Sequence, residues 1–148
     1  MKDEVEMMKK QFSLKADLVI GIGDLSKLTG VSTRQLRYWE KRGYLEAPVT
    51  EKNVTRKYEF EAFYKVRAIK KYLDEGFTLP KAAEQADKQK KQVVICKKFI
   101  NEMFIDVSIE DGEKLFGRID MGYVDVEKIQ HLYGIVDETG SHFEIVKE

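Results

Sequence analysis

Residues 22–41 read IGDLSKLTGVSTRQLRYWEK, and this stretch decides the fold of the first half of the chain. Two short amphipathic segments meet at Gly30, a residue suited to the left-handed conformation that ends many helices. In the first segment Leu25 and Leu28 share one face, so both are expected to pack inward. Ser32 has the side chain that an N-cap needs, which predicts a second helix directly after it. The stretch therefore predicts two helices joined by a tight turn.

The second helix, expected over residues 33–41, has one apolar and one cationic side. Val31, Leu36 and Trp39 recur at helical spacing and form the inward side. The other side carries residues that can bond to base edges or phosphates. A polar loop then leads to a basic step at residues 56–58, which fits a wing on the flanking DNA. The candidate DNA-contacting residues are Arg34, Gln35, Arg37, Tyr38, Lys41, Arg42, Arg56, Lys57 and Tyr58.

Charge is distributed unevenly along this chain, although its formal net charge is zero. Residues 18–83 hold 13 Lys and Arg against 8 Asp and Glu, whereas residues 107–148 hold 4 against 10. A basic part suits a polyanionic partner, and an acidic part does not. A basic helix face is often only a solvated surface, but here it coincides with the turn, the cap and the wing. DNA binding is therefore the favoured interpretation.

These motifs resemble the DNA-binding head of the MerR family of bacterial transcription regulators. The likeness spans residues 22–84 and rests on GVSTRQLRYWE at 30–40, RKY at 56–58 and GFTL at 76–79. VIGI at 19–22 and RKYEF at 56–60 are similar to the glutamine-synthetase repressor subgroup. The resemblance implies a winged helix-turn-helix, a homodimer and a palindromic operator. It also implies DNA contacts from Arg34, Arg37, Tyr38, Arg56 and Lys57.

The sequence departs from the family pattern at two places. Trp39 stands where the family usually has a second tyrosine, and its indole is expected in the core because it buries well on the inward face. The wing loop lacks the glycine that is common in relatives.

The chain as a whole is expected to be an α+β protein in four parts. Residues 1–17 are a polar N-terminal arm, frayed or formed as a short helix. Residues 18–86 form the winged helix-turn-helix, with a β-like piece at 44–46 and further helices at 60–75 and 78–86. Residues 87–106 form a connecting helix, and residues 107–148 form a small acidic β-rich module.

The connecting helix carries an apolar stripe at spacings of three and four residues. A stripe of this kind outside a compact head is better explained by packing on a partner than by exposure. It therefore predicts a dimer interface. The candidate interface residues are Val93, Cys96, Ile100, Met103 and Phe104.

From residue 105 the apolar period changes to two, which predicts strands. A turn at 110–112 with Gly112 in the left-handed region would set Val107 opposite Leu115. A second turn is expected at 137–140, and a short helix over 124–132. The aromatic residues of the module are expected to fill its core rather than line a ligand pocket. The resemblance to the family does not extend to this module, so a small-molecule ligand and a protein partner both stay open.

Several function classes are disfavoured. No apolar run approaches the roughly 20 residues of a membrane span, and the N-terminus has no secretory signal. A single cysteine suits a reducing cytoplasm. Cys96, His131 and His142 lie 35 and 11 residues apart, so neither a metal site nor a cofactor is expected. Tyr123 and Tyr133 flank His131 without a nucleophile–base pair, so an enzyme is not expected.

The sequence thus predicts a regulator that binds a palindromic operator as a homodimer through its N-terminal half. The alternative is an architectural or accessory DNA-binding protein, of a chromosome-organising or phage type, without an effector response. A third interpretation makes residues 107–148 an adaptor for another protein.

Overall fold

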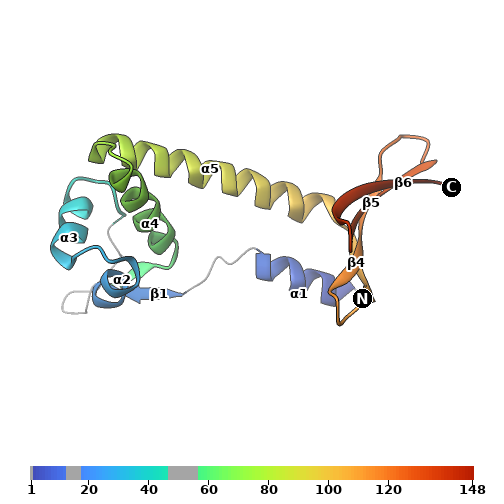
Figure 1. Cartoon of the computed structure of the whole chain (residues 1–148), viewed down its shortest axis with the longest axis horizontal. Helices are drawn as coiled ribbons and strands as arrows, with labels where there is room; N and C mark the ends of the chain where they lie inside the picture. The colour runs from blue at the N-terminus through green and yellow to red at the C-terminus, as the bar shows by residue number, and fades with distance from the viewer. Residues whose placement is uncertain (1, 13–17, 47–56) are drawn as a thin grey trace. The chain divides into compact units, whose positions relative to one another are not determined.

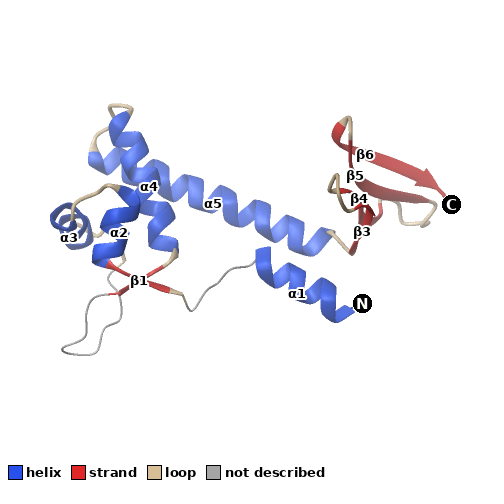
Figure 2. Cartoon of the chain, turned by 60° about the horizontal axis from the view of Figure 1, so that its bottom comes forward, coloured by secondary structure: helices blue, strands red, loops and turns tan. Residues whose placement is uncertain are grey.

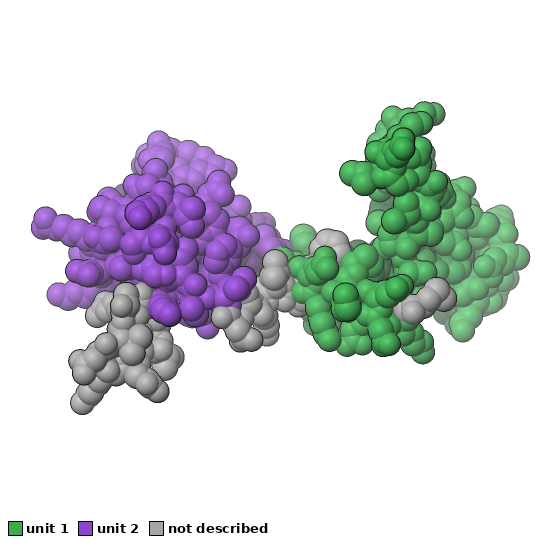
Figure 3. Space-filling model, turned by 90° about the horizontal axis from the view of Figure 1, so that it is seen from below, with its two compact units in different colours: residues 1–14, 95–148 green, residues 15–94 purple. Residues whose placement is uncertain are grey.

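The structure is a computed structural model that describes residues 2–12, 18–46 and 57–148. The chain divides into two compact units, coloured separately in Figure 3. Unit 2 comprises residues 15–94, and unit 1 comprises residues 1–14 together with 95–148. Helices dominate unit 2 and an antiparallel sheet dominates unit 1, so the predicted α+β class is confirmed.

Unit 2 holds a helix-turn-helix on a two-stranded ribbon (Figures 1 and 2). Strand β1 and its partner β2 pair antiparallel, with Ile20 opposite Tyr58. A further helix and the first part of a long one complete the unit. In chain order the elements are β1 (Val19–Gly21), α2 (Ile22–Thr29), α3 (Thr33–Lys41), β2 (Lys57–Glu59), α4 (Glu61–Asp74) and α5 (Leu79–Met103).

The predicted turn between α2 and α3 is confirmed in detail. Gly30 ends α2 with φ 72°, and its N–H donates to the Ser26 carbonyl. Ser32 caps α3, because its hydroxyl accepts a hydrogen bond from the Gln35 N–H at 3.2 Å. These two local devices satisfy backbone groups that helix ends otherwise leave open, so the turn is encoded by the residues that make it.

Leu28 does not pack inward, and that prediction was wrong. Leu25 is fully buried, but Leu28 is 59% exposed. Thr29, four residues after Leu25, is buried in its place and donates its hydroxyl to the Leu25 carbonyl at 2.7 Å. Only one narrow row of side chains in this eight-residue helix faces the core. That row consists of two residues four positions apart, Leu25 and Thr29.

The β-like piece predicted at residues 44–46 is not a strand either. The chain bends there after Gly43, which has φ 80°. Leu45 is still buried, so its apolar character serves the core from an irregular segment. The ribbon partner of β2 is β1, which precedes the helix-turn-helix. The predicted loop over residues 50–54 and Arg56 lie outside the described residues.

Helix α4 confirms the apolar stripe through Val66 and Ile69, both fully buried. Helix α5, however, continues without a break past the predicted end at Ala86, as far as Met103. Ala82, Ala83 and Ala86 are buried against the unit 2 core. They belong to the same buried cluster as Val66 and Ile69 of α4. Ion pairs join α4 to α5 from Lys65 to Asp87 at 2.9 Å and from Lys90 to Glu61 at 3.2 Å.

Unit 1 combines an N-terminal helix with a four-stranded antiparallel sheet of order β3-β4-β5-β6. Helix α1 contacts the segment just before the sheet, where the Lys9 ammonium lies 4.7 Å from the centre of the Phe104 ring. The residues predicted as an arm are thus helical over α1. The elements are α1 (Lys2–Phe12), β3 (Asp106–Asp111), β4 (Phe116–Tyr123), β5 (Gln130–Asp137) and β6 (Gly140–Lys147).

The turn at residues 137–140 is confirmed, but the first hairpin has another register. Val107 pairs with Ile119 rather than Leu115, because the turn lies at residues 112–115 instead of 110–112, and a bulge between Ile109 and Asp111 shifts the register by one more residue. Leu115, not Gly112, has the positive φ of this turn. A left-handed leucine near a bulge could not be predicted from a pattern that favours glycine.

The helix predicted over residues 124–132 was also wrong. Residues 124–129 form a loop and the rest belongs to β5. The Asp125 carboxylate accepts hydrogen bonds from the N–H groups of Ile129 and Gln130, at 3.0 Å and 2.8 Å. These bonds lower the pKa of Asp125. An aspartate that bonds the local backbone in this way competes with helix formation.

The aromatic residues do not fill a common core in unit 1. Phe104 is buried, but Tyr123 and Phe143 are exposed. A single open sheet has no second layer that could cover both of its faces, so the expectation of an aromatic core was wrong for these residues. None of the described helices in either unit is long and apolar enough to span a membrane.

Candidate nucleic-acid interface

Helix α3 presents a cationic face to solvent and an apolar face to the core. Leu36 and Trp39 are buried, and Val31 just before the helix joins them. Arg34, Arg37, Tyr38, Lys41 and Arg42 are all exposed.

None of the described carboxylates neutralises this face. Among the residues that the structure describes, no Asp or Glu forms an ion pair with the four cations on and directly after α3. Cations left without an internal partner raise the local positive potential, and they can neutralise phosphates without first breaking a bond. The face is thus chemically suited to lie on a polyanion.

Gln35, predicted as a base-reading residue, is engaged at the start of the helix. Its side-chain oxygen accepts hydrogen bonds from the Ser32 N–H and hydroxyl, both at 3.1 Å. Together with the Gln35 N–H to Ser32 bond, this is a capping box. The Gln35 oxygen therefore holds the helix end, and because the side chain is exposed, its contact with a base stays a prediction.

Tyr58, also predicted to contact DNA, belongs to the core. It is 1% exposed, and its hydroxyl donates to the Glu40 carboxylate at 2.6 Å. Its neighbours in β2 point the other way because side chains alternate along a strand, and Lys57 is exposed. The buried ring cannot reach a ligand, so we correct this assignment. Lys57 keeps its place in the candidate interface.

The Tyr58–Glu40 bond links the ribbon to the recognition helix. Glu40 lies on α3 and Tyr58 on β2, so the bond fixes the place where the wing begins relative to the cationic face. Sequence reasoning missed Glu40 in this role. A tyrosine and a glutamate 18 residues apart carry no signal of their pairing until the ribbon is formed.

Tyr58→Phe removes only the hydroxyl, and we expect it to lower the free energy of unfolding by about 1–3 kcal/mol, since the bond is made to a charged acceptor. Urea titration followed by circular dichroism measures this change. Tyr44→Phe is a suitable control, because it removes a hydroxyl from a half-buried residue of the same unit. Equal losses in the two variants would contradict a special role for the Glu40 bond.

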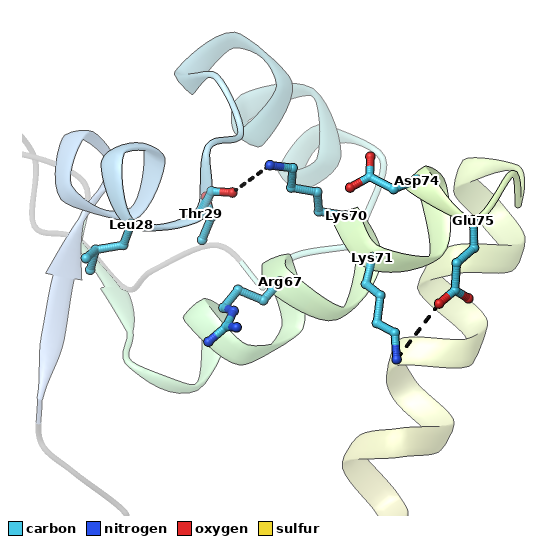
Figure 4. A pocket seen from close by; sticks show the side chains of 7 residues that line it. All are labelled: Leu28, Thr29, Arg67, Lys70, Lys71, Asp74 and Glu75. Atoms are coloured by element: carbon cyan, nitrogen blue, oxygen red, sulfur yellow. Dashed lines mark hydrogen bonds and ion pairs between the residues drawn. The ribbon is translucent and has the colours of Figure 1, made fainter.

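A shallow pocket lies behind the helix-turn-helix, between α2 and α4 (Figure 4). The Lys70 ammonium donates to the Thr29 carbonyl at 3.3 Å, at the C-terminal end of α2. A cation there complements the helix dipole and satisfies a terminal carbonyl. The Lys70 hydrogen bond therefore stabilises the end of α2, where the turn begins. The lining residues are Leu28, Thr29, Arg67, Lys70, Lys71, Asp74 and Glu75.

The predicted dimer stripe on α5 is largely exposed. Val93, Cys96, Ile100 and Met103 all reach solvent in the single chain. Phe104 does not: it follows the end of α5 and is 4% exposed. Its assignment to the interface is therefore corrected, because it is packed within its own unit.

A second group of ionisable residues meets on the sheet of unit 1. The His131 ring stacks on Tyr133 at 4.5 Å, and its Nε2 lies 2.6 Å from the Asp120 Oδ1. The Tyr123 hydroxyl donates to Glu148 at 2.7 Å, which raises the pKa of Tyr123. Tyr123, His131 and Tyr133 were weighed above as possible acid–base groups, and the structure does bring their rings together. Among the described residues, no three His, Cys, Asp or Glu side chains are grouped to hold a metal ion.

Comparisons with known proteins agree with the geometry of unit 2. Residues 21–89 match the family model of the MerR HTH family regulatory protein. The chain is also 37% identical over 70 residues to the HTH-type transcriptional regulator TnrA of Bacillus subtilis (strain 168). That alignment covers 47% of this chain and 63% of TnrA, so the chain spans somewhat under two thirds of its curated relative. Residues 21–89 of this chain are therefore a helix-turn-helix domain of the MerR family.

Proposed function

We propose that the protein is a transcription regulator that binds a palindromic DNA operator as a homodimer. In this proposal α3 lies in the major groove, and Lys57 touches the flanking backbone. The observation that carries it is the exposed face of α3, whose cations have no ion-pair partner among the described residues. The MerR-type domain and the likeness to a transcriptional regulator support the same function.

The residues divide into base readers and phosphate contacts. Arg34 lies in the first turn of α3, where recognition helices contact base edges, and its guanidinium can donate two bonds to guanine. Arg37 and Tyr38 lie one turn further on and suit phosphate oxygens, which set the register on the duplex. At the end of the helix, Lys41 and Arg42 add positive charge near the DNA backbone.

Two copies are proposed because one small recognition helix reads few bases. A dimer doubles the contacts and requires two half-sites at a set spacing. The exposed stripe of α5 supplies an apolar surface for pairing. The sheet-bearing unit 1 is proposed to take up the regulatory input, whether a small molecule or a protein partner. Nothing in this function requires catalysis.

Selection of bound sequences from random DNA, followed by footprinting, tests the proposal. We expect one palindromic sequence with two protected half-sites about one helical turn or a multiple of it apart. Broad protection without a preferred sequence would instead identify an architectural DNA-binding protein and contradict the regulator. Because much of the affinity comes from phosphate contacts, the selection must be run near physiological salt.

A charge on the α5 stripe is expected to separate the copies. Ile100→Glu buries a carboxylate in the proposed contact, so the sedimentation mass should fall at micromolar concentration. Lys91→Glu is the matched control: it also adds a carboxylate to α5, but on the opposite side of the helix. An unchanged mass in Ile100→Glu would place the contact between copies elsewhere.

A further inference from the structure

The sheet of unit 1 has two chemically different faces, which follow from its register. Residues paired across strands point to the same side, and successive residues point to opposite sides. Val107 pairs with Ile119, Ile119 with Gly134, and Gly134 with Phe143, so this row crosses all four strands on one side. We call that side the apolar face. Its paired positions are Val107, Ile109, Gly117, Ile119, Gln130, Leu132, Gly134, Val136, Ser141, Phe143, Ile145 and Lys147.

The apolar face is uncovered in the single chain. Ile109 is 78% exposed, Phe143 73% and Ile145 54%, although helix α1 belongs to the same unit. Among the paired positions just named, Lys147 is the one charged residue, and it lies at the end of β6. A bare apolar sheet face of this extent is not stable in water and marks a contact surface.

The opposite face has the reverse character. It carries Asp120, Glu144 and the stacked His131 and Tyr133 rings, and the Arg118 guanidinium lies 4.7 Å from the centre of the Tyr133 ring. Arg118 also pairs with Glu144 at 3.2 Å. Its charged groups pair with one another, and this side also carries the buried side chains of His131 and Ile135. The opposite face thus satisfies its polar groups by itself, whereas the apolar face is left uncovered.

We propose that the apolar face of the sheet packs against the same face of a second copy of this chain. The size of the face supports a sheet as its occupant. Four strands at about 4.8 Å spacing make a face about 19 Å wide, whereas a helix is about 10 Å across and would cover only half of it. A second sheet covers the full width, as in a β-sandwich.

The area also fits a contact between two copies. Strands of six to eight residues at about 3.4 Å per residue give a face of roughly 400–500 Å². Two such faces together bury roughly 1,000 Å², about the amount at which an interface becomes specific. Since the face is almost uncharged, two copies meet without like-charge repulsion. A strongly basic or acidic partner would find no complementary charge there.

The face also has the self-complementarity that a two-fold contact needs. The protruding side chains of Phe143 and Ile109 each lie beside a glycine in the register, Gly134 and Gly117 respectively. Protruding and side-chain-free positions thus alternate on one surface, so a copy turned by 180° can interlock with it. This contact is distinct from the α5 stripe and adds to the proposed assembly. It does not depend on DNA binding.

Two adjacent substitutions on β6 test the contact. Phe143→Lys places a charge on the apolar face, and His142→Lys places the same charge on the opposite face of the same strand. We expect Phe143→Lys to weaken self-association at least about tenfold, because the ring loses its burial and the charge loses its water. His142→Lys should leave it unchanged. Sedimentation over a range of concentrations measures both, and circular dichroism checks that both variants fold.

Thiol labelling identifies the occupant. In a Cys96→Ser background, Phe143→Cys carries the one thiol of the chain. Its maleimide labelling should slow as protein concentration rises, since a second copy covers it only when copies associate. His142→Cys should label at one rate throughout. Slow labelling of Phe143→Cys that is independent of concentration would assign the face to a segment of the same chain and overturn the proposal.

The results separate this contact from the proposed dimer. If Ile100→Glu changes the mass and Phe143→Lys does not change self-association, the sheet contact is wrong and the α5 dimer stands. If only Phe143→Lys has an effect, the copies associate through the sheet alone. The outcome of the DNA selection does not depend on the result for either variant.

Discussion

Alanine at both Arg34 and Arg37 is expected to weaken binding to the selected operator on the order of 10²–10⁴-fold. A bidentate contact to guanine contributes about 1–3 kcal/mol of discrimination, and a charge-assisted phosphate bond adds a similar amount. Both guanidinium groups are exposed on α3 and make no ion pair with a described residue. Their removal therefore leaves the fold intact and lowers affinity directly.

The single variants distinguish the two roles. Arg34→Ala should relax the preference for particular bases, and a repeated DNA selection would show this. Arg37→Ala should weaken binding to all sequences and flatten the salt dependence by about one unit per copy. Lys98→Ala, on the far part of α5, removes the same charge outside the interface and serves as the control. Unchanged affinity in both arginine variants would refute the assigned face.

Trp39→Ala is expected to lower the free energy of unfolding by about 3–5 kcal/mol. The indole is 3% exposed and belongs to the core that Leu25, Leu36 and Val66 form with it. Small domains are stable by only about 5–15 kcal/mol, so this loss is a large share of the total. DNA binding should then fail because the unit unfolds, not because a contact is missing.

Urea titration followed by circular dichroism measures the change, since the variant lacks the one tryptophan of the chain. Tyr38→Ala, at the neighbouring exposed position, should alter stability by no more than about 0.5 kcal/mol and still weaken DNA binding. This pair separates the packing side of α3 from its binding side. Similar stability in the two variants would contradict the burial of Trp39.

The parts of unit 2 that could be predicted are those made by neighbours in the chain. Gly30 and Ser32 encode the turn because a left-handed cap and an N-cap act within a few residues. The spacing of Leu36 and Trp39 sets the inward side of α3 for the same reason. By placing these two residues inside, it places Arg34 and Arg37 outside.

The errors at Tyr58 and Phe104 concern side chains whose surroundings come from distant segments. Tyr58 has basic neighbours, but its ring is buried because β2 pairs with β1 and sets it beside Glu40. Phe104 continues the apolar stripe, yet the helix ends one residue before it.

The sequence by itself determined the helix-turn-helix, its caps and its cationic face, because hydrogen bonds and helical periodicity act over three or four residues. Only the tertiary structure decided the length of α5, the register of the first hairpin and the burial of Tyr58 and Phe104. It also left one face of the sheet apolar and uncovered. Burial depends on which distant segments pack together, and that is a property of the whole fold rather than of any short pattern.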